Sequence, residues 1–499
     1  MAPEHSRALG PWTRRIPLLT VVACVCLAAA SLLLPSVPSY DAWSWLLWGK
    51  QVVHLDLSTE AGPSWKPLPV LFTALFAPLG TAAPSLWMVV ARAAGLLALV
   101  LAFRVARRLV GPGMPGLAAG AIAALGVATA PEFLRMMGLG TSEGLLMALT
   151  LLALDRHLAE RHRAAFACGV LVGLLRPDAW PLLAAYALWL IRRDRSAWPL
   201  VAGLAVVVPA LWFLPEWWGS GDPLRAVHRA ELPGRTTYLS YVHPVAQAFH
   251  DAWHSVRPAV AVGIALALAL ELARLPRRRP RAMILVPVAA AVAWLALVVL
   301  MVARGFAGTP RYYLGAAAVL AALGGAGWGR LGAAAAARVR QSAASFVTPA
   351  LVAVAAIAVF LASEPGALPA QRSEVRSIHE AAREGVALPT VIARAGGRGR
   401  IVACGLPRTL PAIRPIVAWY LDLPERDIAT HAHHHGFVIQ LRHRASHRFG
   451  PRPMPGARLV AHAGSWRILS ERCASSPARQ GRAGGAPRSS IPGPRSGRA

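Results

Sequence analysis

Long apolar runs repeat through most of this chain, and short arginine-rich turns separate them. Crossing the ~30 Å hydrocarbon core of a membrane takes roughly 20 helical residues, and the first run, residues 16–35, is long enough. The further runs that we expect to cross are residues 85–104, 116–130, 143–158, 164–175, 179–191, 198–214, 258–273, 283–302, 313–328 and 346–362. The pattern predicts about eleven crossings, whereas residues 69–79 are too short to need to cross.

Composition agrees with a polytopic membrane protein, because 56% of the residues are hydrophobic and only 15% are charged. The formal net charge of +29 would suit nucleic acid if it formed one patch, but the arginines lie in small groups between apolar runs. We therefore expect membrane lipids as partners and no nucleic acid.

The arginine groups also predict the orientation of the chain. By the positive-inside rule the arginine-rich turns and the N-terminus are cytoplasmic, in a plasma membrane. The opposite turns are residues 36–69, 131–142, 215–257 and 304–311. These turns are longer and mixed in charge, so we expect the chemistry at the extracytoplasmic face.

The last part of the chain is more polar, and an odd number of crossings places it outside. The sequence predicts an all-α polytopic membrane bundle over residues 1–363, followed by a small extracytoplasmic α/β domain over residues 364–473. Its expected elements are helices at 373–384 and 415–421, strands at 400–404 and 437–441, and a hairpin of 458–461 and 466–469. Cys404 and Cys473 can form one disulfide if this domain is exported. Residues 474–499 predict a disordered basic tail.

The first external loop, residues 36–69, holds the strongest candidates for chemistry. Asp41 begins a short helical pattern that predicts a helix lying in the membrane interface. Lys50 and Lys66 are the only lysines of the chain, and a flexible ammonium group suits a phosphate. In the structural alternative Asp41 caps the helix and the lysines extend to the interface. The loop by itself does not decide between the two.

Further charged residues lie at other turns and breaks. Glu132, Arg135 and Glu143 belong to the second external turn, where Glu143 also suits a helix N-terminus. Arg176 and Asp178 interrupt an apolar hairpin. Near-membrane charges are costly, so these two are either paired with each other or functional.

Two other motifs have residues that suit a binding site. Arg311 and Tyr312 begin a late span, and an arginine there suits either an interfacial belt or a lipid phosphate. The run containing His431, His433, His434 and His435 predicts a solvated loop, because no Cys or acid follows at metal-binding spacing.

The order of these motifs resembles the GT-C class of integral-membrane glycosyltransferases. The similarity is greatest to the group with protein O-mannosyltransferases, lipid A aminoarabinose transferase and related actinobacterial-type enzymes. It covers residues 16–328 and depends on Asp41 after the first span, the segment WKPLPVL, the turn FLRMMGLGTSEGLL, the break LLRPDAW and the late PRYYL. Two positions depart from the family: Asp41 is not followed by a second acid, and Lys66 stands where His-Pro-Pro is usual.

The resemblance implies inverting transfer of a sugar from a polyprenyl-phosphate donor to a glycan, lipid or protein acceptor of the cell envelope, with mannose as one expected sugar. Asp41 would be the general base, and Lys66, Arg135 and Arg311 would hold the phosphate. Glu143 would position substrate or, as in some relatives, a divalent metal. The remaining expected substrate-binding residues are Arg176, Asp178 and Tyr312.

Two other classes of protein remain open from the sequence. One is a membrane transporter or lipid flippase, although we find no internal repeat of the kind transporters show. The other is a non-catalytic scaffold for the exported domain, which would be favoured if Asp41 and Glu143 lay far apart.

Overall fold

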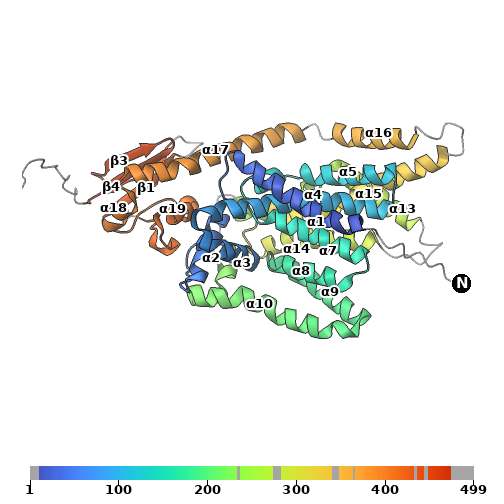
Figure 1. Cartoon of the computed structure of the whole chain (residues 1–499), viewed down its shortest axis with the longest axis horizontal. Coiled ribbons are helices and arrows are strands. Elements are labelled where there is room, and N and C mark those ends of the chain that lie inside the picture. The colour runs from blue at the N-terminus through green and yellow to red at the C-terminus, as the bar shows by residue number, and fades with distance from the viewer. Residues whose placement is uncertain are drawn as a thin grey trace, which may run out of the picture.

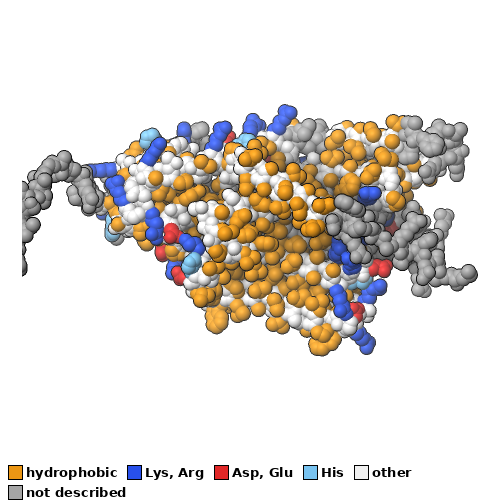
Figure 2. Space-filling view, in the orientation of Figure 1, with side chains coloured by type: hydrophobic (Ala, Val, Ile, Leu, Met, Phe, Trp, Pro, Cys, Tyr) orange, Lys and Arg blue, Asp and Glu red, His pale blue; other side chains and the backbone are white. Residues whose placement is uncertain are grey.

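A computed structural model describes residues 11–232, 237–273, 283–339, 348–363, 366–431, 435–442 and 448–473. The molecule is elongated, with a helical bundle along most of its length and a small sheet at one end (Figure 1). Hydrophobic side chains cover the middle of the visible face, and Lys and Arg gather toward its two ends (Figure 2). This distribution is typical of a protein that crosses a membrane.

A helix lies at each predicted apolar run. The helices of the bundle are α1 (Pro11–Ala30), α2 (Tyr40–Val53), α3 (Pro67–Phe76), α4 (Ala83–Val110), α5 (Met114–Ala128), α6 (Phe133–Gly138), α7 (Glu143–Leu158), α8 (His162–Gly173), α9 (Trp180–Arg193), α10 (Trp198–Ser220), α11 (Arg225–Ala230), α12 (Pro244–His254), α13 (Pro258–Leu272), α14 (Leu285–Ala303), α15 (Leu314–Val339) and α16 (Thr348–Ala362).

The predicted number of about eleven crossings is not confirmed. Among the described residues, four helical stretches are long and apolar enough to cross a membrane: Pro67–Val110, Arg195–Ser220, Leu285–Ala303 and Pro310–Ala337. A fifth is present if α12 and α13, which meet at 71°, form one broken span. Other expected spans are short, such as α8 with 12 residues, whereas a full crossing takes roughly 20.

Small residues hold the centre of the bundle together, where α13 packs against α15. A Cβ atom on Gly327 would lie 1.8 Å from the carbonyl oxygen of Gly263, so a side chain there would force the two helices apart. Such close approach of backbones is how membrane helices gain packing energy.

The first part of helix α2 is buried within the protein. All eight residues Ala42–Gly49 are buried. On one side the Thr73 hydroxyl of α3 donates to the Trp45 carbonyl at 2.7 Å, and on the other Trp43 packs on Trp419 with ring centroids 5.7 Å apart. The C-terminal domain packs on α2 through its helix α19 (Arg414–Leu421), and the position of α2 at the membrane interface stays a prediction. The cap is Ser39, not Asp41.

The C-terminal domain combines three helices with a four-stranded antiparallel sheet of order β2-β1-β4-β3. Its elements are α17 (Ala367–Arg394), α18 (Gly397–Ala403), α19 (Arg414–Leu421), β1 (Gly436–Arg442), β2 (Phe449–Gly450), β3 (Arg458–Ala463) and β4 (Trp466–Glu471). Long helix α17 runs from the bundle to the sheet and packs on β3 and β4 (Figure 1).

The elements predicted at 415–421, 437–441 and in the closing hairpin are confirmed, but the strand predicted at 400–404 is wrong. That segment forms α18, in which Ile401 is completely buried. The β-branched residues favour a strand only weakly, so packing decides their conformation.

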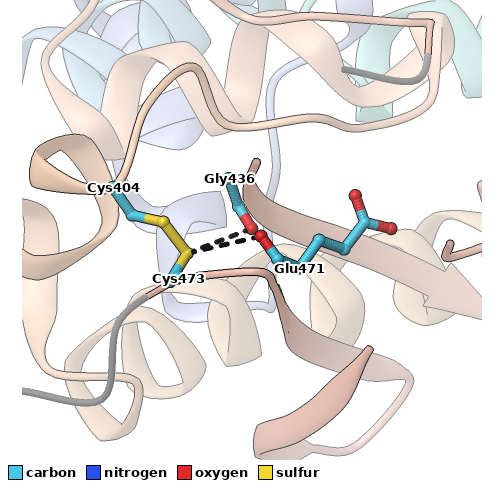
Figure 3. Close-up of a disulfide and its surroundings, with 4 residues drawn as sticks. All are labelled: Cys404, Gly436, Glu471 and Cys473. Carbon is cyan, nitrogen blue, oxygen red and sulfur yellow. Dashed lines mark hydrogen bonds between the residues drawn. A yellow bond between two sulfur atoms is a disulfide. The ribbon is translucent and has the colours of Figure 1, made fainter. Parts of the chain in front are cut away.

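Cys404 and Cys473 form a disulfide, with Cα atoms 5.7 Å apart (Figure 3). The bond joins the end of α18 to the residues after β4, and the Cys473 sulfur lies 3.4 Å from the Gly436 carbonyl oxygen at the start of β1. The disulfide allowed by the sequence is therefore present. The predicted basic tail, His433 and His434 lie outside the described residues.

Candidate active site

Asp41, Arg311 and Glu143 form a line of opposite charges at one end of the bundle. The Arg311 Nη2 atom lies 2.8 Å from Asp41 Oδ2, and its Nε atom lies 3.7 Å from Glu143 Oε1. The Asp41 side chain is only 13% exposed and that of Glu143 1%. Asp41 and Glu143 therefore lie close together, on the same arginine. A non-catalytic scaffold would have been favoured if they lay far apart.

Each of these residues lies at the start of a helical element. Asp41 is in the first turn of α2, Glu143 is the first residue of α7, and Arg311 belongs to the 3-10 turn Pro310–Tyr313 that leads into α15. A carboxylate is favourable at a helix N-terminus, whereas an arginine is not. The two acids therefore compensate an arginine in an unfavourable position.

Lys66 lies on the Glu143 side of this line. Its Nζ atom donates to the Ser142 hydroxyl at 3.1 Å and lies 5.3 Å from the ring centroid of Trp45. Burial, together with the neighbouring cations Arg311 and Arg176, lowers the pKa of Lys66 to about 8, against the opposing effect of Glu143. Part of the Lys66 population is therefore neutral at mildly alkaline pH.

Glu143 is a buried carboxylate that can still accept hydrogen bonds. Neither carboxylate oxygen has a hydrogen-bond partner among the described residues. The hydroxyl of Thr141 lies close by, but it donates to the Met136 carbonyl. A buried carboxylate without donors costs free energy, which a ligand with hydroxyl groups would recover.

Arg176 and Asp178 form the local pair that the sequence allowed. Two parallel contacts of 2.9 and 3.2 Å join the guanidinium to the carboxylate, and the Trp294 indole donates to Asp178 at 2.8 Å. The Arg176 guanidinium also lies 3.4 Å from the ring centroid of Tyr312. This buried pair therefore supports Tyr312, the neighbour of Arg311.

Arg135 stands apart from the other predicted phosphate ligands. It forms an ion pair with Glu132 at 3.0 Å, and its side chain is 43% exposed. Among the described residues no contact joins it to Lys66 or Arg311. The short helix α6 that carries it packs on α17 instead.

An ion pair that was not expected from the sequence fixes the first loop. Glu216 of α10 lies 3.2 Å from Arg225 and accepts from the Trp65 backbone at 3.1 Å. Arg225 also donates to the carbonyls of Ala61 and Gly62 at 3.0 and 3.2 Å. These contacts hold the backbone next to Lys66. An acid inside the apolar stretch FLPEWW was the available signal.

Glu425 of the C-terminal domain was also missed. It is 2% exposed, and neither carboxylate oxygen has a partner among the described residues, since the adjacent Ser44 hydroxyl donates to the Tyr40 carbonyl. Burial raises the pKa of Glu425 to about 7, against the lowering effect of Ser44 and of the cations Arg414 and Arg225. No local pattern marks this residue, because only the docking of the domain buries it.

The charge cluster does not fit a resident metal ion. In the described part of the chain no group of three or more His, Cys, Asp or Glu is placed to hold one. Arg311 occupies the space between the two acids, where a divalent cation would have to bind. We therefore derive no step that uses a metal.

Comparison with known proteins leaves the family open. No family model matches the sequence, and no curated protein matches it. Two solved structures of ArnT from Cupriavidus metallidurans are similar at 16% identity. The one bound to undecaprenyl phosphate covers 91% of this chain and 97% of its own with a TM-score of 0.48, and the apo structure covers 92% and 98% with 0.49. Similarity at this level assigns neither a family nor a function.

Proposed function

We propose that this chain is a membrane glycosyltransferase that moves a sugar from a polyprenyl-phosphate donor to a hydroxyl group of a glycan, lipid or protein. The observation that carries the proposal is the buried line Asp41, Arg311 and Glu143 with Lys66 beside it. Cations and carboxylates alternate there at the end of an apolar bundle. A donor of this class also combines charged, polar and apolar parts: an anionic phosphate, a sugar and a hydrocarbon chain.

The two cations would bind the phosphate of the donor. Charge-assisted hydrogen bonds from arginine and lysine to phosphate are among the stronger polar contacts in proteins. A phosphate that approaches Arg311 competes with Asp41 for the guanidinium. Donor binding would therefore release the Asp41 carboxylate at the point in the cycle when a base is needed.

Asp41 would then act as the general base. It takes the proton of the acceptor hydroxyl while that oxygen forms a bond to the anomeric carbon, and the bond from this carbon to the phosphate oxygen breaks. The phosphate leaves as an anion held by Arg311 and Lys66, so no general acid is required. A single displacement inverts the anomeric configuration. Glu143 would accept hydrogen bonds from the sugar.

A transporter or lipid flippase is the second candidate. The bent pair α12 and α13 favours it, because broken helices are a feature of transporters. The two candidates differ in chemistry, since only the transferase breaks a bond in the donor.

The test is a transfer assay with purified protein in liposomes and a panel of radiolabelled polyprenyl-phosphate sugars. Wild type is compared with Asp41→Asn and with the control Asp56→Asn, an exposed acid of the same loop. Transfer by wild type and the control but not by Asp41→Asn supports the proposal. Movement of intact donor between leaflets without transfer would support the second candidate instead.

A further inference from the structure

A second charged cavity lies at the other end of α4 and α7. Trp87, near the start of α4, packs on Trp45 with ring centroids 5.5 Å apart, next to the candidate active site. At 1.5 Å per residue, Arg104 on the same helix lies about 26 Å further along. The cavity there has a volume of about 640 Å³ and opens between α1, α4 and α7. It is therefore separate from the Asp41 cluster.

Positive charge is in excess in this cavity. Arg104, Arg107 and Arg108 of α4 and Arg156 of α7 line it. Asp155, whose side chain is completely buried, lies 3.1 Å from Arg104 Nε, 3.2 Å from Arg108 Nη2 and 2.9 Å from Arg156 Nη2. One carboxylate for four guanidinium groups leaves a net charge of +3. Arg107 is exposed and has no ion pair among the described residues.

Apolar side chains continue the cavity away from the arginines. On α4 the lining residues that precede the arginines by one to three turns are Leu97, Val100 and Leu101. Helix α1 contributes Val21. Val21 is 43% exposed and Val100 is 38% exposed, so this wall is open to the apolar surroundings of the bundle. A ligand that matches both parts has an anionic group joined to a hydrocarbon chain.

We propose that this cavity binds an anionic phospholipid, with the headgroup phosphate among Arg107, Arg108 and Arg156 and an acyl chain against Val21 and Val100. A soluble phosphate would leave the apolar wall uncovered. A zwitterionic lipid would leave the positive charge uncompensated, because its own ammonium group would enter the same site. The proposal does not depend on sugar transfer.

Binding of radiolabelled lipids to the purified full-length protein in detergent tests this site. Phosphatidylglycerol is compared with phosphatidylcholine, which has the same chains and phosphate but no net charge, and with glycerol phosphate, which has no chains. We expect phosphatidylglycerol to bind at least about tenfold more tightly than either, since each basic residue near an anionic headgroup adds to the affinity.

Two variants and a control locate the binding. Arg107→Gln is expected to weaken phosphatidylglycerol binding about fivefold, and Val100→Trp, which fills the apolar part without changing charge, is also expected to weaken it. Arg192→Gln removes an exposed arginine at the end of α9, outside the cavity, and should leave the affinity unchanged. The proposal is overturned if phosphatidylcholine or glycerol phosphate binds as tightly as phosphatidylglycerol. It is also overturned if Arg107→Gln keeps wild-type affinity, or if Arg192→Gln loses as much affinity as Arg107→Gln.

Discussion

Asp41 Oδ2 lies 2.8 Å from Arg311 Nη2, although the two residues are far apart in the sequence. The contact joins the loop of residues 36–69 to the beginning of α15, and the same arginine reaches Glu143. In the structure the Asp41 carboxylate is therefore engaged in an ion pair. A ligand that competes for Arg311 would change the state of Asp41.

Replacing Arg311 by Gln should raise the KM for a polyprenyl-phosphate donor by roughly 10- to 100-fold, because a hydrogen bond to a charged group contributes about 1.5–3 kcal/mol. Steady-state transfer kinetics in liposomes measure this change. Arg304→Gln is the matched control, since Arg304 is an exposed arginine of the turn over residues 304–311. Equal KM values in the two variants would contradict a phosphate-binding role for Arg311.

The pH dependence of kcat/KM should report Lys66 in the free enzyme. Burial lowers its pKa to about 8, so its ammonium group is charged below that pH and loses its proton above it. Donor capture should therefore fall as pH rises through about 8.

Lys66→Arg provides the control, because a guanidinium remains charged across this range. Its profile should stay flat between about pH 7 and 9.5, even if its absolute activity is lower. A fall near pH 8 that persists in Lys66→Arg would show that another group titrates there.

Glu425 should make the stability of the protein depend on pH. Its pKa is raised from 4.5 to about 7, so the folded protein holds this proton more tightly than the unfolded chain does. The free energy of unfolding should therefore fall as pH rises from about 4.5 to about 7 and change little above that range. Glu425→Gln should remove this contribution and raise the unfolding temperature at pH 8, but not at pH 4.

Thermal unfolding of the full-length protein in detergent at the two pH values measures the effect. Asp427→Asn changes a half-exposed acid of the same turn and should leave the pH dependence as in wild type. An unchanged pH dependence in Glu425→Gln would exclude this residue as its source.

The disulfide should stabilise the C-terminal domain. It closes a loop of 69 residues between Cys404 and Cys473, for which chain entropy predicts about 4 kcal/mol. Changing both cysteines to serine should lower the unfolding temperature and increase proteolysis of this domain, and a reducing agent should do the same to wild type. Cys26→Ser, at an exposed free cysteine, should have no such effect. Insensitivity to the reducing agent would contradict this role.

The sequence predicted the helices well because apolar runs are a local signal. The number of membrane crossings stays a prediction, because whether a helix as short as α5 or α8 crosses also depends on its neighbours. In the C-terminal domain the hairpin was predicted from its alternation of apolar and polar residues. Helix α18 was not, since burial of Ile401 outweighs a weak strand preference.

The candidate site was only partly predictable for the same reason. Asp41, Lys66, Glu143 and Arg311 each stood out as a charge next to an apolar run, and the fold brings them together. Arg135 stood out equally, yet it lies with Glu132 because the direction of α6 is set by packing on α17. Glu425 becomes a buried charge only when two distant parts of the chain meet, which no local pattern can show.

The most direct test of Asp41 as the general base is the turnover number of Asp41→Asn with a saturating donor that wild type uses. Asparagine keeps the size of the side chain but cannot accept the acceptor's proton. We predict that kcat falls by a factor of about 10² to 10⁴, the range for loss of a general base. The KM for the donor should not rise, because Asp41 competes with the phosphate for Arg311, and Asp56→Asn should keep wild-type kcat. A kcat in Asp41→Asn close to that of wild type would contradict the role assigned to Asp41.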